Sequence, residues 1–131
     1  MELDHVGFAV RSLPAALKVF EPLFGVSGSA PELVAGQKVR VSFLEVGPSH
    51  VELLEPTEAD SAVGRFIEKR GEGMHHVAFR VPSVDAQLRE VESRGGKLID
   101  RVGRPGARGR KVGFVHPAAA NGVLVEFVEG S

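Results

Sequence analysis

Four residues with metal-binding side chains occupy matching places in the two halves of this 131-residue chain. His5 and His76 lie 71 positions apart, and Glu52 and Glu126 lie 74 positions apart, each glutamate inside an apolar stretch. A buried carboxylate is costly unless it is paired or bound to a cation. Imidazole nitrogen and carboxylate oxygen suit a first-row divalent ion whose remaining positions take water or substrate. We therefore predict that these four residues bind a metal ion.

The paired histidines belong to a longer internal repeat. Identical residues recur on the same 71-residue shift at His5/His76, Val6/Val77, Phe8/Phe79, Val10/Val81, Ser12/Ser83, Ala15/Ala86, Leu17/Leu88, Gly25/Gly96, Val41/Val112 and Phe43/Phe114. A duplicated unit explains this pattern. We expect a single domain over residues 1–131, with one repeat at about 1–70 and the other at about 74–131. Each half is too small to bury a separate core.

Each repeat reads as a strand, a helix and three further strands. Residues 2–10 alternate as a strand does, and Ser12 can cap the helix that follows. In the second repeat, Ser83 repeats this cap, and strands are expected at 97–101, 111–116 and 123–128, with residues 103–110 as a loop. A short helix at about 62–69 precedes the second repeat. These patterns, with the resemblance given below, predict an α+β fold in which two tandem βαβββ modules form one curved, eight-stranded mixed sheet around a metal site.

Three further histidines are assigned no ligand role. His75 should face away from its neighbour His76, because successive residues of a strand point to opposite faces. His50 and His116 have no repeat partner, so we interpret both as surface or loop-end residues.

The composition limits the possible partners and compartment. Sixteen basic and seventeen acidic residues leave a net charge of −1, so nucleic acid and anionic membranes are not expected partners. The chain has no cysteine, which excludes disulfides, thiolate metal sites and a cysteine nucleophile. It begins without a basic and then apolar leader and has no run long enough to span a bilayer. We expect a soluble, cytoplasmic protein.

One segment is nonetheless strongly basic. Five cations surround a glycine-rich stretch: Arg101, Arg104, Arg108, Arg110 and Lys111. They could form a solvated loop, or they could bind an anionic substrate at the mouth of the site. Under the second interpretation, Arg104, Arg108 and Lys111 are the candidate substrate-binding residues.

Several motifs resemble a known superfamily over nearly the whole chain. They are Leu3-Asp4-His5-Val6-Gly7, Val51-Glu52-Leu53-Leu54-Glu55-Pro56, Gly71-Glu72-Gly73-Met74-His75-His76-Val77-Ala78-Phe79, and Val115-His116-Pro117 followed by Asn121-Gly122-Val123-Leu124-Val125-Glu126. With the duplicated βαβββ unit, they resemble the vicinal-oxygen-chelate superfamily, which includes glyoxalase I, extradiol dioxygenases, antibiotic-sequestering proteins and methylmalonyl-CoA epimerases. The similarity is greatest to the epimerases.

The resemblance implies an isomerase that interconverts (R)- and (S)-methylmalonyl-CoA by removing the α-proton, through a metal-stabilised enolate. It implies His5, His76 and Glu126 as metal ligands, with Glu52 where members have glutamine or glutamate. For that reaction, Glu52 and Glu126 are the predicted catalytic residues, which would carry the proton on opposite faces of the substrate. Cobalt is the ion that the resemblance favours, while the ligand set also accepts manganese, nickel, zinc or magnesium. It also implies an acyl-CoA substrate and a homodimer. The alternatives are a glyoxalase I-type isomerase, an extradiol dioxygenase-like enzyme and a ligand-sequestering protein.

The chain departs from the epimerase pattern at two places. Members often have a Pro-Glu-Gln run before the second strand, where this chain has Val34-Ala35-Gly36-Gln37. A carboxylate near the site is therefore missing, which leaves the second proton carrier open. Members also often have histidine where Arg108 stands, so substrate phosphates could be held differently.

Overall fold

The computed structural model describes residues 1–130. Its elements repeat one order, strand, helix and three strands, in each half of the chain, with helix α2 (Ala62–Arg70) between the halves. The eight strands follow the hydrogen-bonded order β2-β3-β4-β1-β5-β8-β7-β6 and mix parallel with antiparallel pairs. The predicted α+β fold with a duplicated βαβββ module and an eight-stranded mixed sheet is confirmed.

The chain divides into two compact units, and the strands β1 and β5 are each divided between them. The N-terminal unit comprises His5–His75, and the C-terminal unit comprises Met1–Asp4 together with the chain from His76 onward. Strands β1 (Glu2–Ala9) and β5 (Gly73–Val81) therefore each contribute residues to both units.

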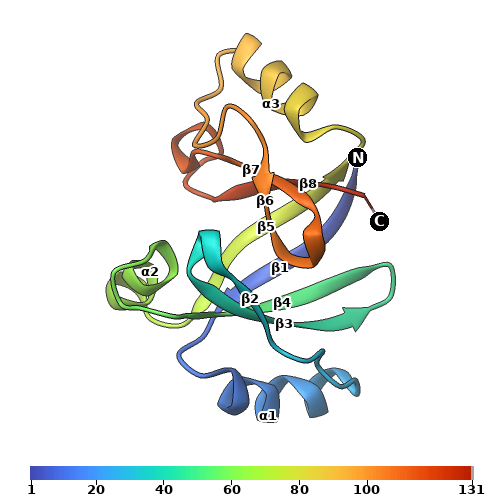
Figure 1. The fold of residues 1–131 in the computed structure, drawn as a ribbon, viewed down its shortest axis with the longest axis vertical. Coiled ribbons are helices and arrows are strands. Elements are labelled where there is room, and N and C mark those ends of the chain that lie inside the picture. The colour runs from blue at the N-terminus through green and yellow to red at the C-terminus, as the bar shows by residue number, and fades with distance from the viewer. Residues whose placement is uncertain (131) are drawn as a thin grey trace. The chain divides into compact units, whose positions relative to one another are not determined.

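The N-terminal unit is built on β3 (Val39–Val46) and β4 (Ser49–Pro56), which form an antiparallel pair (Figure 1). Strand β2 (Glu32–Val34) extends β3, and β1 runs parallel to β4. Helix α1 (Leu13–Phe24) packs on this sheet. Its core is made by Val10, Leu13, Leu44 and Leu53, all buried.

Helix α1 begins and ends where local sequence chemistry predicts. The Ser12 hydroxyl accepts a hydrogen bond from the Ala15 N–H at 3.3 Å, and Pro14 stands in the first turn, where no helical N–H is needed. Gly25 ends the helix in the left-handed conformation at φ 70°.

The C-terminal unit repeats this plan with β5, α3 (Val84–Ser93), β6 (Arg104–Pro105), β7 (Lys111–Val115) and β8 (Val125–Glu129) (Figure 1). Strand β8 runs parallel to β5 and antiparallel to β7. Its core contains Val81, Val84, Leu88, Val115 and Phe127. Gly113 of β7 lets α3 approach closely, because a Cβ there would lie 2.7 Å from a Leu88 methyl group.

One predicted strand is wrong. Residues 97–101 form no strand, and only Leu98 makes an isolated bridge, to Val115. The ladder stops there because the Asp100 carboxylate accepts a hydrogen bond from the Phe114 N–H at 2.8 Å, where a partner strand would offer a carbonyl. The edge strand is instead β6, inside the segment that the sequence predicts to be a loop.

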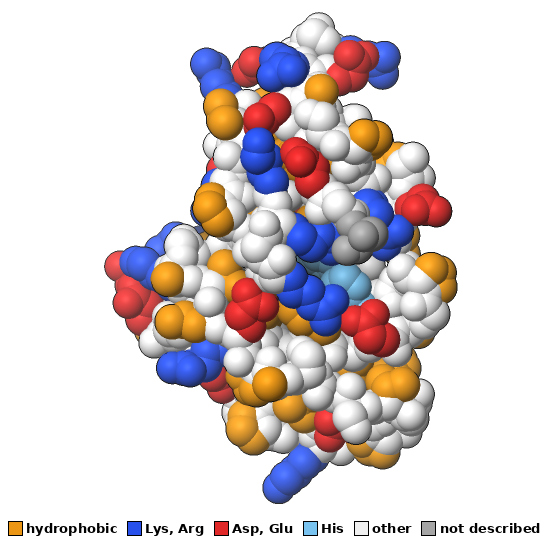
Figure 2. Space-filling view, turned by 45° about the vertical axis from the view of Figure 1, so that its right-hand side comes forward, with side chains coloured by type: hydrophobic (Ala, Val, Ile, Leu, Met, Phe, Trp, Pro, Cys, Tyr) orange, Lys and Arg blue, Asp and Glu red, His pale blue; other side chains and the backbone are white. Residues whose placement is uncertain are grey.

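The surface carries charges of both signs, in keeping with the net charge of −1. Figure 2 shows Lys and Arg side chains interspersed with Asp and Glu. Among the residues that the structure describes, no helix has the length and hydropathy needed to cross a bilayer.

Candidate metal-binding residues

The N-terminal unit contains a buried histidine and glutamate in contact. His5 lies on β1 and Glu52 on the parallel strand β4, whose register places Glu52 opposite Gly7. The His5 Nε2 atom is 3.3 Å from Glu52 Oε1, and the two residues are 4% and 6% exposed. A carboxylate is rarely buried to this degree without a cationic, protonated or metal partner.

The C-terminal unit contains the same pair at equivalent positions. The His76 Nε2 atom is 3.0 Å from Glu126 Oε1, and both residues are about 5% exposed or less. Glu126 of β8 lies opposite Ala78 of β5, which repeats the register of Glu52 and Gly7. The repeat inferred from the sequence therefore extends to the placement of the side chains.

These residues fit a divalent cation. Each unit provides an imidazole nitrogen and a carboxylate oxygen that point at each other within a largely apolar core. A cation would neutralise the buried carboxylates and use donors of the type that such ions prefer. The buried histidines and glutamates can therefore bind a metal ion.

His50 is not the surface histidine that the sequence predicts. It is 7% exposed, and its ring stacks on the His5 ring, with centroids 4.9 Å apart and planes inclined by 22°. Phe43 meets the His50 ring edge-on at 4.9 Å. One signal could have indicated this burial, since His50 precedes Glu52 by two residues and must share its face of the strand.

The other two histidines lie as expected. His75 turns its ring to Phe66, with centroids 4.9 Å apart. The His116 Nδ1 atom accepts a hydrogen bond from the Ala118 N–H at 3.0 Å, at the start of the short 3-10 helix Pro117–Ala119. His116 is therefore a loop-end residue.

Two cations of the basic segment around β6 contact acidic side chains of the same unit. The Arg104 guanidinium lies over the Phe114 ring at 5.3 Å, and its buried Nε, 3.4 Å from Asp100 Oδ1, makes no hydrogen bond within the described residues. Lys111 Nζ is 3.2 Å from Asp85 Oδ2. Arg108 is exposed and adopts a left-handed conformation at φ 59°.

Two arginines donate hydrogen bonds to the carboxylate of Asp4, the residue that precedes the candidate ligand His5 on β1. Asp4 is 1% exposed, accepts two hydrogen bonds from Arg110 at 2.9 and 3.1 Å, and accepts one from Arg80 Nε at 3.0 Å. The hydrogen bond to Asp4 is the main cause that raises the pKa of Arg80 above its ordinary value. Arg110 also donates to the carbonyl oxygens of Glu129 and Gly130, so it ties the end of β8 to the start of β1.

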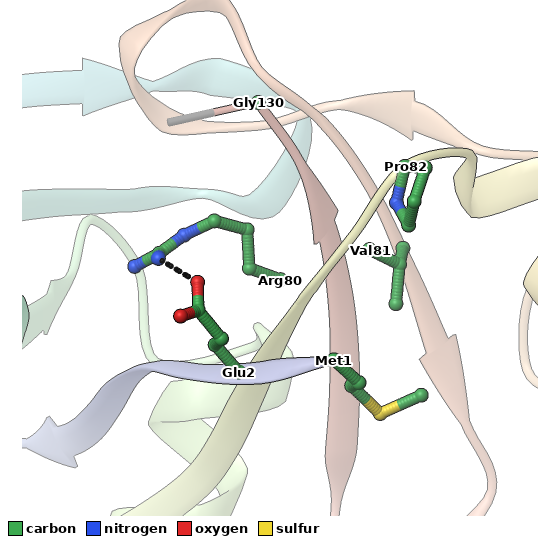
Figure 3. A pocket seen from close by; sticks show the side chains of 6 residues that line it. All are labelled: Met1, Glu2, Arg80, Val81, Pro82 and Gly130. Carbon is green, nitrogen blue, oxygen red and sulfur yellow. Dashed lines mark hydrogen bonds and ion pairs between the residues drawn. The ribbon is translucent and has the colours of Figure 1, made fainter.

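The C-terminal unit also has an open cavity of about 430 Å³. Figure 3 shows its lining residues, which are Met1, Glu2, Arg80, Val81, Pro82 and Gly130. Arg80 Nη1 and Glu2 Oε1 form an ion pair of 3.0 Å there. None of these residues is a predicted ligand or substrate contact.

Comparison with known proteins agrees with the resemblance seen in the sequence. Residues 4–114 match the model of the Glyoxalase/Bleomycin resistance protein/Dioxygenase superfamily. The uncharacterized protein YqjC of Bacillus subtilis is 43% identical over 97% of this chain and 91% of its own. An ethylmalonyl-CoA/methylmalonyl-CoA epimerase of Cereibacter sphaeroides is 33% identical over 95% of this chain and 94% of its own.

A solved structure with the same fold also carries the epimerase name. It is a Streptomyces coelicolor methylmalonyl-CoA epimerase variant in complex with 2-nitronate-propionyl-CoA, 34% identical, with a TM-score of 0.95 over 100% of this chain and 95% of that one. With its duplicated module and its buried histidine and glutamate pairs, this chain belongs to the Glyoxalase/Bleomycin resistance protein/Dioxygenase superfamily and is a relative of the methylmalonyl-CoA epimerases.

Proposed function

We propose that this chain is a metal-dependent isomerase that interconverts (R)- and (S)-methylmalonyl-CoA. The observation that carries this proposal is the pair of buried histidine and glutamate contacts, one in each unit, at 3.3 and 3.0 Å. They occur in a chain whose relatives named as epimerases align over nearly its whole length. His5, Glu52, His76 and Glu126 would together hold one divalent ion.

The reaction requires a carbon acid to lose its proton and regain it on the other face. The α-carbon lies between a thioester and a carboxylate, and a carboxylate of the enzyme takes its proton while the C–H electron pair moves into an enolate. A second carboxyl group, which is protonated at the start, then donates its proton to the opposite face and is left as a carboxylate. A divalent ion, when bound, would supply Lewis-acid stabilisation of the charge that develops on the thioester oxygen.

Glu52 and Glu126 are the carboxylates that we assign to these two transfers. Inversion needs a carrier for each face, and the duplication provides two glutamates of similar burial and register. The short 3-10 helix Ala35–Gln37 occupies the place where epimerases often have a Pro-Glu-Gln run, and it contains no acid. The chain must therefore transfer both protons without that additional glutamate.

The basic segment would bind the anionic part of the substrate. Arg104, Arg108 and Lys111 lie in or beside β6 and β7, and a guanidinium fork suits bidentate contact with phosphate or carboxylate. The packing of Arg104 on Phe114 holds one such group in place.

Turnover of (S)-methylmalonyl-CoA to the (R) epimer tests the proposal directly. We expect activity that chelation removes and that Co²⁺ or a related divalent ion restores, with elemental analysis identifying the ion in the purified protein. The hemithioacetal of methylglyoxal and glutathione, and ethylmalonyl-CoA, serve as competing substrates. Turnover of the hemithioacetal alone would favour a glyoxalase I-type isomerase, whereas ligand binding without turnover or metal would favour sequestration.

We further propose a cytoplasmic homodimer. A mass near that of one 14.0 kDa chain in solution would contradict the dimer. Cell fractionation tests the location, since a relative from Bos taurus, 31% identical over 95% of this chain, is named as a mitochondrial methylmalonyl-CoA epimerase.

A further inference from the structure

His50 is a buried imidazole that the proposed reaction does not use. The parallel register of β1 and β4 sets His50 opposite His5. Their rings lie 4.9 Å apart between centroids and are inclined by 22°, which is an offset stack. The ring of His50 therefore covers one face of the His5 ring.

His50 is itself firmly placed. It lies on β4, between β1 on one side and β3 on the other, with Glu45 opposite it on β3. Phe43 meets its ring edge-on, at 4.9 Å and 80°. A ring fixed by two neighbouring strands and an aromatic contact can restrict the rotation of the ring stacked on it.

In the C-terminal unit, the side chains beside the candidate ligand His76 differ from those beside His5. The register that pairs Ala78 with Glu126 brings Leu124 to the place equivalent to His50, and the Val77 N–H donates to the Leu124 carbonyl at 3.2 Å. The His76 ring meets the edge of Phe114, with centroids 6.0 Å apart and an angle of 82°. The stacked imidazole is thus a feature of the N-terminal unit that the duplication does not explain.

We propose that His50 is a positioning residue for His5. By stacking on the imidazole, it fixes the plane in which the His5 Nε2 atom faces Glu52, and it thereby raises the affinity for the divalent ion. This inference rests on the metal site of the proposed function. Mutation of a residue that orients a metal ligand typically lowers the affinity for the metal by about 10- to 100-fold, because a ligand that is already oriented loses less conformational freedom on binding.

Cobalt binding to the metal-free protein tests this role. We expect His50→Leu, which introduces the side chain found at the equivalent place in the other unit, to weaken Co²⁺ binding by about tenfold or more, as measured by calorimetry and visible absorbance. His50→Phe keeps a ring that can stack, so it should bind within about threefold of the wild type. His75→Leu is the matched control, because that histidine adjoins a proposed ligand but packs on Phe66, and its affinity should not change.

A second readout needs no metal. In the metal-free protein, the NMR signals of the His5 ring should broaden or shift in His50→Leu and should remain sharp in His50→Phe. If His50→Leu does not fold, Co²⁺ binding by His50→Phe that is more than about threefold weaker than that of the wild type still rejects the inference.

Three results would overturn the inference in distinguishable ways. A wild-type protein that binds no Co²⁺ would remove the proposed metal site as well. Wild-type binding with equal affinity in His50→Leu would reject the positioning role and leave the proposed function intact. Binding by His50→Phe as weak as that of His50→Leu would also reject it, since the stacked ring would then not be the cause.

Discussion

Each unit of this protein contains one histidine and one glutamate that are candidate metal ligands, but the side chains around these ligands differ between the units. In the N-terminal unit, His5 is covered by the aromatic ring of His50, and helix α1 packs through Leu13 on an apolar sheet. In the C-terminal unit, His76 adjoins Phe114, whose ring also carries the Arg104 guanidinium. Duplication has thus kept the donor atoms, while the environment of each pair has diverged. We infer that the units contribute equally to proton transfer and unequally to metal positioning and substrate binding.

The largest effect should come from the carboxylates, which are proposed to be equivalent. Glu126→Gln and Glu52→Gln should each slow epimerisation by about 10²- to 10⁴-fold, because each removes one proton carrier while keeping an oxygen donor. Each variant should fail to exchange the α-proton of one epimer for solvent deuterium. The epimer that fails to exchange in Glu126→Gln should be the opposite of the one that fails in Glu52→Gln. Unchanged exchange in Glu126→Gln would remove that residue from the mechanism, and loss from the same epimer in both variants would contradict the division of faces.

A second comparison concerns stability, because the charged contacts of the two units differ in burial. Arg110→Ala should destabilise the protein by about 3 kcal/mol, since it leaves the buried Asp4 carboxylate with fewer partners. Chemical denaturation measures this loss. The control is Arg11→Ala in the N-terminal unit, where the pair with Glu72 is exposed and should contribute less than about 1 kcal/mol. Equal losses of unfolding free energy in the two variants would show that the contacts of the buried Asp4 stabilise the fold no more than an exposed ion pair does.

Substrate affinity provides a third comparison. Replacing both Arg104 and Arg108 by alanine should raise KM for methylmalonyl-CoA about tenfold with a much smaller change in kcat, and the effect should shrink as salt is added. Alanine at Arg40 and Arg65, two arginines of the N-terminal unit, should leave KM unchanged. An unaltered KM in the first double variant at low salt would mean that the basic segment is only a solvated surface.

The smallest expected effect is on the pH dependence of stability, through Asp85 in the C-terminal unit. The hydrogen bond from the Gly103 N–H, followed by the Lys111 ammonium, lowers the pKa of the Asp85 carboxyl below its ordinary value. A lowered folded-state pKa stabilises the fold above the unfolded pKa of about 4, and this contribution is lost as the pH falls through the folded value. Asp85→Asn should therefore be slightly less stable at pH 7 and equal to the wild type in strong acid, as thermal unfolding between pH 2 and 7 would show. A constant difference across that range would refute the assignment.

Local chemistry accounts for the parts of the fold that the sequence predicted well. Ser12, Ser61 and Ser83 each accept a hydrogen bond from the N–H three residues on, and Gly25 adopts the left-handed conformation that ends α1. These features depend on residues a few positions apart, so they can be identified without knowing the rest of the molecule. The duplication could also be found in the sequence, because it preserves residue identity at a fixed spacing. It led to the four candidate ligands.

Tertiary structure decided the features that depend on distant strands. His50 has no repeat partner and looks like a loop-end residue, yet it is buried because β1 and β3 flank it and Phe43 packs on it. Residues 97–101 have a strand-like composition, but a strand needs backbone groups on its neighbour that are available for hydrogen bonding. The Phe114 N–H on β7 instead donates to the Asp100 side chain. The sequence by itself determined the residue types, the repeat and the helix ends, since these are local or follow from identity. Burial and strand pairing were settled only by folding, because each depends on which segments come to lie beside a residue.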